Sequence, residues 1–331
     1  MHRITLGNTV FEGENNAYLF SGEQIVLVDT GVAVSESRAD LEAGLAEHGL
    51  EFADVDAVVL THYHADHAGL AGEIQAASGA TVHAHTADAP LIAGVESAWD
   101  DVRETHRRLF TEWGMPEDDR EDLLAYLESG AELRGPDPAV EPFDGGDRLQ
   151  FGDLELEAVH APGHAAGLAM FVLETDEVLT GDALLPVYTP NVGGADVRVD
   201  RPLERYLETL EAIATAGFER AWPGHRDPIE DPAGRARTII EHHEERAYRV
   251  LSVLAEHGPA DAWTVSAHLF GDLEDIHVLH GPGEAYAHLE HLTRDGEVEP
   301  TDEGYRITDD AADRLADRSD GRWPLASLEV D

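Results

Sequence analysis

Short apolar runs and stretches with helical spacing alternate along the first 85 positions of the chain. Strand-like runs separated by turn residues occupy residues 3–30, and further apolar runs cover residues 55–60 and 81–84. Residues 36–49, with Leu41 and Leu45 on one face, and residues 70–78 are expected to form helices between the runs. This alternation predicts a layered α/β fold.

A different pattern over about residues 95–130 predicts a pair of helices inserted between strand units. Strand patterns resume in short stretches between residues 148 and 179, and a helix over 202–216 and a strand over 220–222 follow. Residues 1–230 are therefore expected to form one domain that contains the insert. Within the insert, large side chains recur every three or four residues at Trp99, Val102, His106, Leu109, Phe110 and Trp113, and again at Leu123, Leu124 and Leu127.

The C-terminal third predicts a connecting helix and a small second domain. Residues 231–257 have the pattern of one long helix. In the remaining residues 258–331, helical patterns over 264–269 and 283–293 precede two short strand patterns around a turn at 302–304. Two helices followed by a two-stranded wing predict a winged-helix domain, with the connecting helix as its third helix.

The composition indicates more about the salt conditions in which the protein works than about its fold. The 331 residues include 42% hydrophobic residues, enough for a substantial core. They also include 68 acidic and only 22 basic residues, all of them Arg, for a formal net charge of −46. Because the acids are spread along the chain, this charge indicates a surface adapted to very high salt, as in halophilic archaea; a cationic partner is the alternative.

The same charge disfavours nucleic acids and anionic membranes as partners. In molar salt the Debye length falls to ~3 Å, so the charge does not exclude an RNA substrate. The chain has no cysteine, which excludes disulfides, thiolate metal sites and cysteine nucleophiles. The first residues carry no apolar signal core, and no run approaches the ~18 apolar residues of a membrane span. We therefore expect a cytoplasmic protein.

Four candidate metal ligands fall within six residues at His62, His64, Asp66 and His67, directly after the apolar run that ends at Leu60. Alternation along a strand would project His62 and His64 the same way. The turn after them would return Asp66 and His67 to the same point. Imidazole suits zinc, and carboxylate suits zinc, iron or manganese. So dense a group of donors predicts a site for two metals, with further ligands downstream.

Three downstream positions have the same local character. His164, Asp182 and His225 each lie in or beside a glycine-containing turn that follows an apolar strand pattern. Glycine lets the backbone bend sharply, so each donor can be presented at a sheet edge.

These motifs, in this order, resemble those of the metallo-β-lactamase superfamily over residues 1 to about 230. The resemblance implies an αββα sandwich with one metal held by His62, His64 and His164. It implies a second metal held by Asp66, His67 and His225, with Asp182 bridging the two. Asp29, at the end of an early strand, matches an acidic residue that orients a ligand histidine; a turn cap is the alternative.

The complete ligand set favours hydrolysis, because two metals ~3.5–4 Å apart can share a hydroxide that acts as the nucleophile. One metal also polarises the oxygen under attack, while Asp66 orients the nucleophile or accepts its proton. Single-iron persulfide dioxygenases of the superfamily do not use the second ligand set, and its β-lactamases with a cysteine ligand are excluded. We expect two zinc ions per chain, with iron or manganese as alternatives.

Two groups of relatives suggest different substrates. Glyoxalase II (hydroxyacylglutathione hydrolase) places helices after the same core and cleaves thioesters. The β-lactamase-like endoribonucleases add a C-terminal winged helix, which residues 288–298 resemble. This chain, however, lacks a basic stripe with aromatic residues for RNA. We therefore predict a zinc-dependent hydrolase of a thioester or small ester. The alternatives are an endoribonuclease for single-stranded RNA and a non-enzymatic metal-binding regulator.

Substrate contacts are expected from the loop after Asp182, at Tyr188, Asn191 and Arg198, and from Tyr63 between two ligands. The helical insert is expected to cover the metals and shape a pocket. The winged helix is expected to pack against the core or to mediate a homodimer. The remaining histidines, among them His83, His85, His160, His242 and His243, are interpreted as structural or surface residues.

Overall fold

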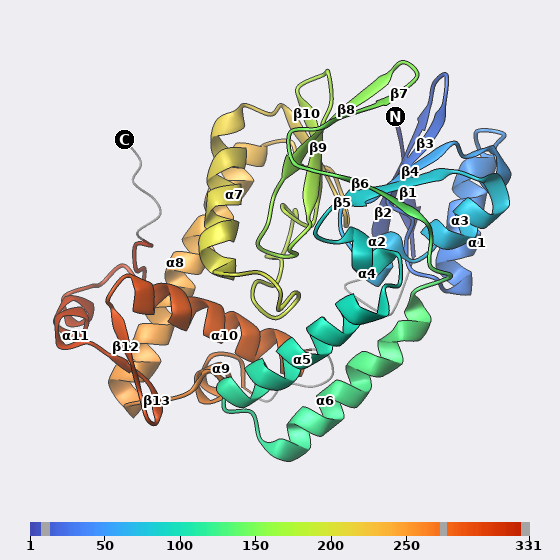
Figure 1. Ribbon diagram of the computed structural model, residues 1–331. Helices are drawn as coiled ribbons and strands as arrows, with labels where there is room; N and C mark the ends of the chain where they lie inside the picture. Colours follow the sequence, from blue (N-terminus) through green and yellow to red (C-terminus); the bar gives the residue numbers. More distant parts are fainter. Residues whose placement is uncertain (8–13, 272–276, 326–331) are drawn as a thin grey trace.

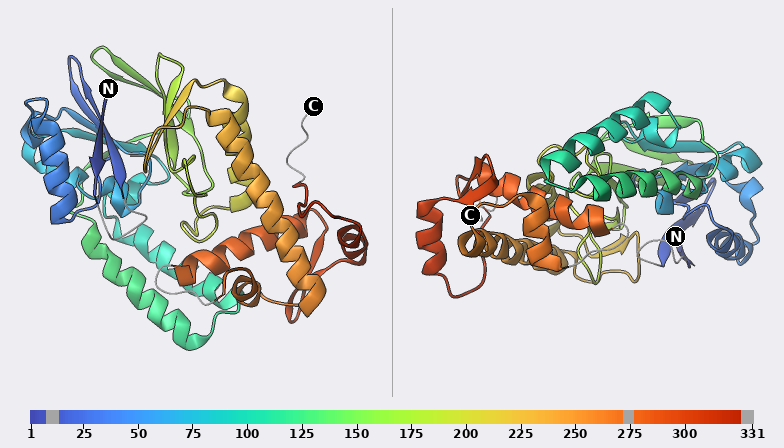
Figure 2. Two further views of the ribbon diagram at one scale, coloured as in Figure 1. Left: turned by 180° about the vertical axis from the view of Figure 1, so that it is seen from behind. Right: turned by 90° about the horizontal axis from the view of Figure 1, so that it is seen from below.

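Two β-sheets lie face to face in the computed structural model, and helices cover the outer face of each sheet (Figures 1 and 2). The structure describes residues 1–7, 14–271 and 277–325. One cluster of buried apolar side chains fills the space between the sheets, and another lies under each layer of helices. The predicted α/β fold with four layers is therefore confirmed.

The N-terminal sheet has six strands in chain order, with the first three antiparallel and the third to sixth parallel. Its outer face is covered by two helices whose buried residues, such as Leu41, Leu45 and Ile74, pack against the sheet. The strands are β1 (His2–Leu6), β2 (Asn15–Ser21), β3 (Ile25–Val28), β4 (Ala57–Val59), β5 (Thr81–His85) and β6 (Val140–Phe143), and the helices are α1 (Ser35–Ala46) and α3 (Ala71–Ser78), with the short η1 (Phe52–Asp54) between them.

The second sheet has five strands, of which the last two run parallel and the others antiparallel. Two helices cover its outer face and bury Leu210, Ile213 and Ile239 against it. The strands are β7 (Arg148–Phe151), β8 (Leu154–His160), β9 (Ala169–Val172), β10 (Glu177–Gly181) and β11 (Arg220–Pro223), and the helices are α7 (Pro202–Ala216) and α8 (Pro232–His257).

The inserted helices lie beyond one end of the two sheets and pack against the C-terminal helices (Figures 1 and 2). Phe110 and Trp113 of the insert share one buried cluster with Leu251 and Leu289. The insert and the C-terminal helices therefore stabilise each other at this end of the two sheets. The insert consists of α5 (Glu96–Glu112), α6 (Glu117–Ser129) and η2 (Gly130–Leu133), and it is preceded by the short α4 (Ala89–Ile92).

The C-terminal unit contains the predicted succession of helices and hairpin, but its second helix begins six residues earlier than predicted. The motif Gly281-Pro282-Gly283 lies within the helix, with Pro282 inside it. Gly283 permits a close contact there, because a Cβ on it would lie 2.4 Å from the Cα of Gly194. The elements are α9 (Ala262–Phe270), α10 (His277–Arg294), β12 (Val298–Thr301), β13 (Gly304–Ile307) and α11 (Asp309–Ala316).

The strand before the first ligand motif is shorter than predicted. β4 ends at Val59, so His62 and His64 lie in the loop after the strand. Their common direction comes from this loop and not from strand alternation, which corrects the sequence-based argument. Asp66 and His67 lie in the short helix α2 (Ala65–Ala68). Among the described residues, no helix is long and apolar enough to span a membrane.

Candidate metal centre

Seven predicted ligands converge at one edge of the sandwich, where strands of both sheets end. His62 and His64 follow β4, and Asp66 and His67 lie in α2. The other three, His164, Asp182 and His225, follow β8, β10 and β11 of the second sheet. Their donor atoms form three groups in which all atoms lie within 4.8 Å of one another: His62/His64/His164, His62/His67/Asp182 and Asp66/His67/His225.

The first group consists of three imidazoles with facing nitrogen atoms. His64 Nδ1 lies 2.9 Å from His62 Nε2 and 3.1 Å from His164 Nε2. His62 is buried, as is His164. This geometry brings three ligand atoms of the kind that zinc prefers to one point.

Asp182 lies between this first group and the second group of donors, which consists of Asp66, His67 and His225. Its Oδ2 atom is 3.6 Å from His164 Nε2 and 3.5 Å from His225 Nε2, while its Oδ1 atom is 3.5 Å from His67 Nε2. Asp66 Oδ2 completes the second group at 3.4 Å from His225 Nε2. The carboxylate of Asp182 therefore faces donors of both groups, as a bridging ligand would.

Hydrogen bonds on the outer side of the imidazoles orient the rings. His67 donates from Nδ1 to Asp29 Oδ2 at 2.9 Å, and His164 donates from Nδ1 to the carbonyl oxygen of Asn191 at 2.9 Å. His64 donates from Nε2 to the carbonyl oxygen of Ala195 at 3.1 Å. Because carboxylate and carbonyl oxygens only accept, each outer nitrogen carries a proton, and the inner nitrogen is the one available to a metal.

His62 follows the same rule through a hydroxyl group. Thr61 Oγ1 donates to Asp29 Oδ2 at 2.8 Å, so its oxygen accepts from His62 Nδ1 at 3.0 Å. Asp29 also accepts from the Thr61 N–H at 2.8 Å. One buried carboxylate thus supports two of the candidate ligands, directly at His67 and through Thr61 at His62.

Two of the inner atoms are buried without a hydrogen-bond partner among the described residues. These atoms are His67 Nε2 and Asp182 Oδ1. Buried polar atoms are costly when unpaired. A divalent metal ion fits here, because it would coordinate the lone pairs that the outer hydrogen bonds leave facing inward.

The charges of the site also favour a cation. Burial lowers the pKa of His62 well below its usual value and that of His64 to about 4, so both rings are neutral ligands at pH 7. Burial alone would lower the pKa of His225, but Asp182 and Asp66 raise it to about 10. Although burial alone would raise the pKa of Asp182, His225 and His67 hold it well below the usual range. Two ionised carboxylates therefore face the donors.

A glycine makes the close approach at the bridging position feasible. A Cβ on Gly224 would lie 2.4 Å from Asp182 Oδ1 and 2.6 Å from His67 Cε1. Both distances are shorter than any normal contact. The Gly224-His225 motif therefore needs glycine for space beside the donors.

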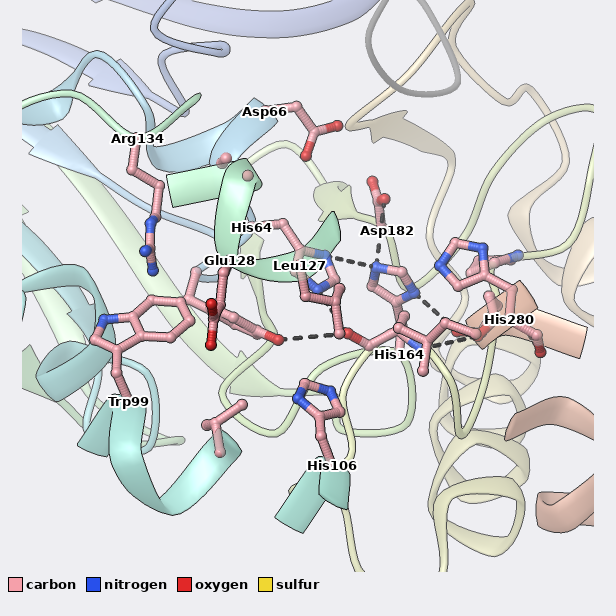
Figure 3. A pocket seen from close by; sticks show the side chains of 18 of the residues that line it. His64, Asp66, Trp99, His106, Leu127, Glu128, Arg134, His164, Asp182 and His280 are labelled. Carbon is pink, nitrogen blue, oxygen red and sulfur yellow. Dashed lines mark hydrogen bonds and ion pairs between the residues drawn. The ribbon is translucent and has the colours of Figure 1, made fainter. Parts of the chain in front are cut away.

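The donors form one wall of a cavity of about 320 Å³ (Figure 3). His64, Asp66, His164, Asp182 and His225 contribute to this wall. The insert lies opposite and shapes this pocket, as predicted, with the polar side chains of Arg103, His106 and Glu128 and with several apolar side chains. The apolar side chains include Trp99, Val102, Leu124 and Leu127, and Leu185 and Leu279 add to them from elsewhere in the chain.

The four predicted substrate contacts differ in position. Tyr63 and Asn191 line the cavity, whereas Tyr188 and Arg198 are not among the lining residues. The Asn191 side chain accepts from the N–H groups of Gly194 and Ala195 and donates to the carbonyl oxygen of His280 at 3.0 Å. Asn191 therefore holds the loop that accepts the hydrogen bonds of His64 and His164.

Arg198 is engaged in a buried network. Its Nη2 atom lies 2.7 Å from Asp88 Oδ1 and 2.6 Å from Asp196 Oδ2, and its guanidinium group stacks 4.5 Å from the centre of the Tyr63 ring. Asp88 also accepts from the Tyr63 N–H, and Asp196 accepts from the Ala166 N–H. The network thus joins the two loops that carry His62, His64 and His164.

Several cavity residues have little signal in the sequence. Arg134, His106 and His280 line the cavity, and Asp88 fixes Tyr63, but they come from separate segments without a shared motif. Asp88 follows β5, so its position after a strand end was the one available signal.

Two predicted structural histidines lie beside the site. His160 donates from Nε2 to the carbonyl oxygen of Ala166 at 2.8 Å and stacks on His85 at 4.1 Å between ring centres. Its bond to Ala166 helps to shape the loop that carries His164.

A further group of donors, His243, Glu284 and His288, lies between α8 and α10. There, Arg246 pairs with the Glu284 carboxylate, and His288 Nδ1 donates to the Glu284 carbonyl oxygen. Its remaining nitrogen, Nε2, faces His243 Nδ1 at 3.3 Å. Arg246 and the Glu284 carbonyl oxygen therefore hold two of these donors, whereas His243 Nε2 has no hydrogen-bond partner among the described residues.

Comparison with known proteins agrees with the fold and the motifs. Residues 10–225 match the family model of the Metallo-beta-lactamase superfamily. Because the match covers more than half of the chain, the chain belongs to this superfamily, and the resemblance inferred from its motifs is confirmed.

Particular relatives extend the similarity over nearly the whole chain. A metallo-beta-lactamase family protein from Thermus thermophilus is 32% identical with a TM-score of 0.80, covering 93% of this chain and 98% of that one. A β-lactamase domain protein from Burkholderia ambifaria shares the fold at 22% identity and a TM-score of 0.73, with 92% and 91% covered. The probable metallo-hydrolase YqjP of Bacillus subtilis is 28% identical over 294 residues, 85% of this chain and 88% of the relative.

Proposed function

We propose that this protein is a zinc-dependent hydrolase that uses two metal ions to cleave a thioester or small ester. The observation that carries the proposal is the set of inward-facing donors on one wall of an apolar cavity. Membership of the superfamily and similarity to a probable metallo-hydrolase support it. His62, His64 and His164 would hold one ion, Asp66, His67 and His225 the second, and Asp182 would lie between them.

The bound ions would supply Lewis acidity toward the carbonyl oxygen and lower the pKa of a water molecule. Asp66 is placed to orient that water, because its carboxylate lines the cavity. Although burial alone would raise the pKa of Asp66, His67 and His225 hold it well below the usual range. The carboxylate is therefore ionised at pH 7 and accepts a hydrogen bond from the water.

The cavity supports a small substrate. Its volume of about 320 Å³ is near the lower limit of the about 300–1,000 Å³ typical of small-molecule sites. The apolar side chains of the insert would bind an acyl chain and exclude bulk water from the reacting group. A polynucleotide would instead need an open, positively charged groove with stacking residues.

The test compares substrates and metal dependence in one protein preparation. Purified protein in molar salt is incubated with an acyl thioester and with single-stranded RNA, each with and without a chelator. The proposal predicts thioester cleavage that stops on chelation and resumes when zinc is restored. Chelator-sensitive cleavage of RNA with an inert thioester would contradict it in favour of a nuclease. Turnover of neither substrate by the metal-loaded protein would favour a non-enzymatic role.

A further inference from the structure

We propose that Arg134 binds an anionic group on the substrate, so that the preferred ester carries a carboxylate or phosphate at the end of an apolar chain. The inference rests on the proposed function, because it names the class of substrate for the same cavity. Arg134 follows η2, at the end of the insert, and lines the cavity together with Trp99 of α5.

Among the described residues, the guanidinium group of Arg134 lacks the acceptors that such a group normally has. Its Nη1 atom is buried without a hydrogen-bond partner, and Arg134 makes no ion pair within the part of the chain that the structure describes. Its five N–H groups can only donate. An oxyanion in the cavity would supply the acceptors, and a carboxylate or phosphate can do so through two parallel hydrogen bonds.

A shortage of acidic residues does not explain the missing partner. The chain has 68 acidic residues for 22 arginines, so acceptors are abundant. Arg103, the other arginine that lines the cavity, has two of them: its Nη2 atom lies 2.6 Å from both Glu96 Oε1 and Asp100 Oδ1. Arg103 is thus neutralised within the protein, whereas Arg134 is available to a ligand.

Trp99 holds the Arg134 side chain in a defined position. The guanidinium carbon lies 3.6 Å from the centre of the Trp99 ring. The ring is itself fixed, because Trp99 Nε1 donates to the carbonyl oxygen of Leu91 at 3.0 Å. Stacking leaves the edge of the guanidinium plane free for hydrogen bonds while it restricts the rotamers of the side chain. Less conformational entropy is then lost when an anion binds.

The position of Arg134 relative to the metal centre defines the shape of the ligand. Figure 3 shows Arg134 and Trp99 on one side of the cavity, Asp182 and His164 on the other, and Leu127 and Glu128 between them. A substrate with its ester group at the donors would place an apolar segment beside Leu127. The far end of this segment would then reach Arg134, so we expect the substrate to carry its negative charge there.

Two thioesters of equal chain length test this specificity. One carries a hexanoyl group and the other an adipoyl group, which adds a terminal carboxylate to the same chain. We expect wild type to prefer the adipoyl substrate by about 10- to 100-fold, mainly through KM, the range for a charge-assisted hydrogen bond. Arg134→Gln should bring the ratio of kcat/KM for the adipoyl and hexanoyl substrates to about one, mainly through a raised KM for the adipoyl substrate. Arg103→Gln, the matched control, should retain the preference.

A binding measurement separates this inference from the proposed function. Metal-free protein is titrated calorimetrically with hexanoate, hexyl phosphate and hexanol at one salt concentration. We expect at least one of the two anions to bind wild type and Arg103→Gln about tenfold or more tightly than Arg134→Gln, with hexanol showing no difference. The anion with the larger ratio identifies the head group.

Equal affinities of wild type and Arg134→Gln for both anions would overturn the inference, as would a preference for the adipoyl thioester that survives in Arg134→Gln. If neither thioester is cleaved, the proposed ester hydrolysis fails, but the titration of the metal-free protein still decides whether Arg134 binds an anion.

Discussion

Asp29 accepts a hydrogen bond of 2.9 Å from Nδ1 of His67, and both side chains are buried. Asp29 follows β3, and His67 lies in α2 after β4. The backbone of the next residue repeats the connection, since the Thr30 N–H donates to the His67 carbonyl oxygen at 2.7 Å. The end of one strand thus fixes a candidate metal ligand that is carried by another segment.

Replacing Asp29 with Asn should weaken metal binding without removing a ligand. An amide has one accepting oxygen, whereas Asp29 accepts from His67 Nδ1, Thr61 Oγ1 and the Thr61 N–H. At least one of these donors would then face an NH₂ group. We expect metal affinity to fall about 10- to 100-fold, as measured by competition with a chelator. The exposed Asp227→Asn is the control, and an unchanged affinity in Asp29→Asn would contradict a positioning role.

Replacing Asp182 with Ala should reduce the metal content more than replacing Asp66. Asp182 faces histidines of both groups, whereas Asp66 belongs to the second group alone. We expect Asp182→Ala to lose thioester hydrolysis and both ions, and Asp66→Ala to retain about one ion per chain. Metal analysis after gel filtration measures the difference. Wild-type activity in Asp182→Ala would contradict the two-metal proposal.

Replacing Arg198 with Gln should destabilise the fold. Its side chain is 18% exposed, and its two partners, Asp88 and Asp196, are buried. Loss of the guanidinium group leaves two buried carboxylates without their cation, which costs about 3–5 kcal/mol. We expect a loss of this size in the free energy of unfolding from urea denaturation. Arg148→Gln, which removes the exposed pairs with Glu155 and Glu157, should cost at most about 1 kcal/mol.

A second outcome would instead support the substrate contact that the sequence predicts for Arg198. Unchanged stability of Arg198→Gln together with a raised KM would indicate that the guanidinium group contacts the substrate, as the sequence suggested.

His288 should make stability depend on pH. Burial lowers the pKa of His288 to about 3 in the folded state, whereas the unfolded chain has the usual value of about 6.5. The unfolded state therefore binds the proton first, so stability is complete above pH 6.5 and falls as the pH decreases toward 3.

A variant isolates this contribution. Between pH 7 and pH 5, wild type should lose about 2 kcal/mol more of its free energy of unfolding than His288→Gln. Urea denaturation at both pH values measures the difference, and the exposed His257→Gln should behave like wild type. A pH dependence of wild-type size in His288→Gln would contradict the assignment to His288.

The position of most elements followed from the sequence, because apolar periodicity and turn residues are local properties. The predicted helix over 202–216 agrees with α7 to the residue, and the insert is observed within a few residues of 95–130. The largest error was the start of α10, which lies six residues before the predicted start at residue 283. Packing against Gly193 and Gly194 decided that case, and packing partners distant in the chain leave no local pattern.

The sequence by itself determined the seven candidate ligands, because each donor lies next to a strand end in a recognisable motif. Only the tertiary structure decided how Asn191, Arg198 and Arg134 are used. All three are polar residues in irregular segments, where sequence alone does not indicate a partner. In the folded protein, Asn191 forms hydrogen bonds within its own loop, and Arg198 forms ion pairs with Asp88 and Asp196. Arg134 lines the cavity, and its buried Nη1 atom has no hydrogen-bond acceptor among the described residues.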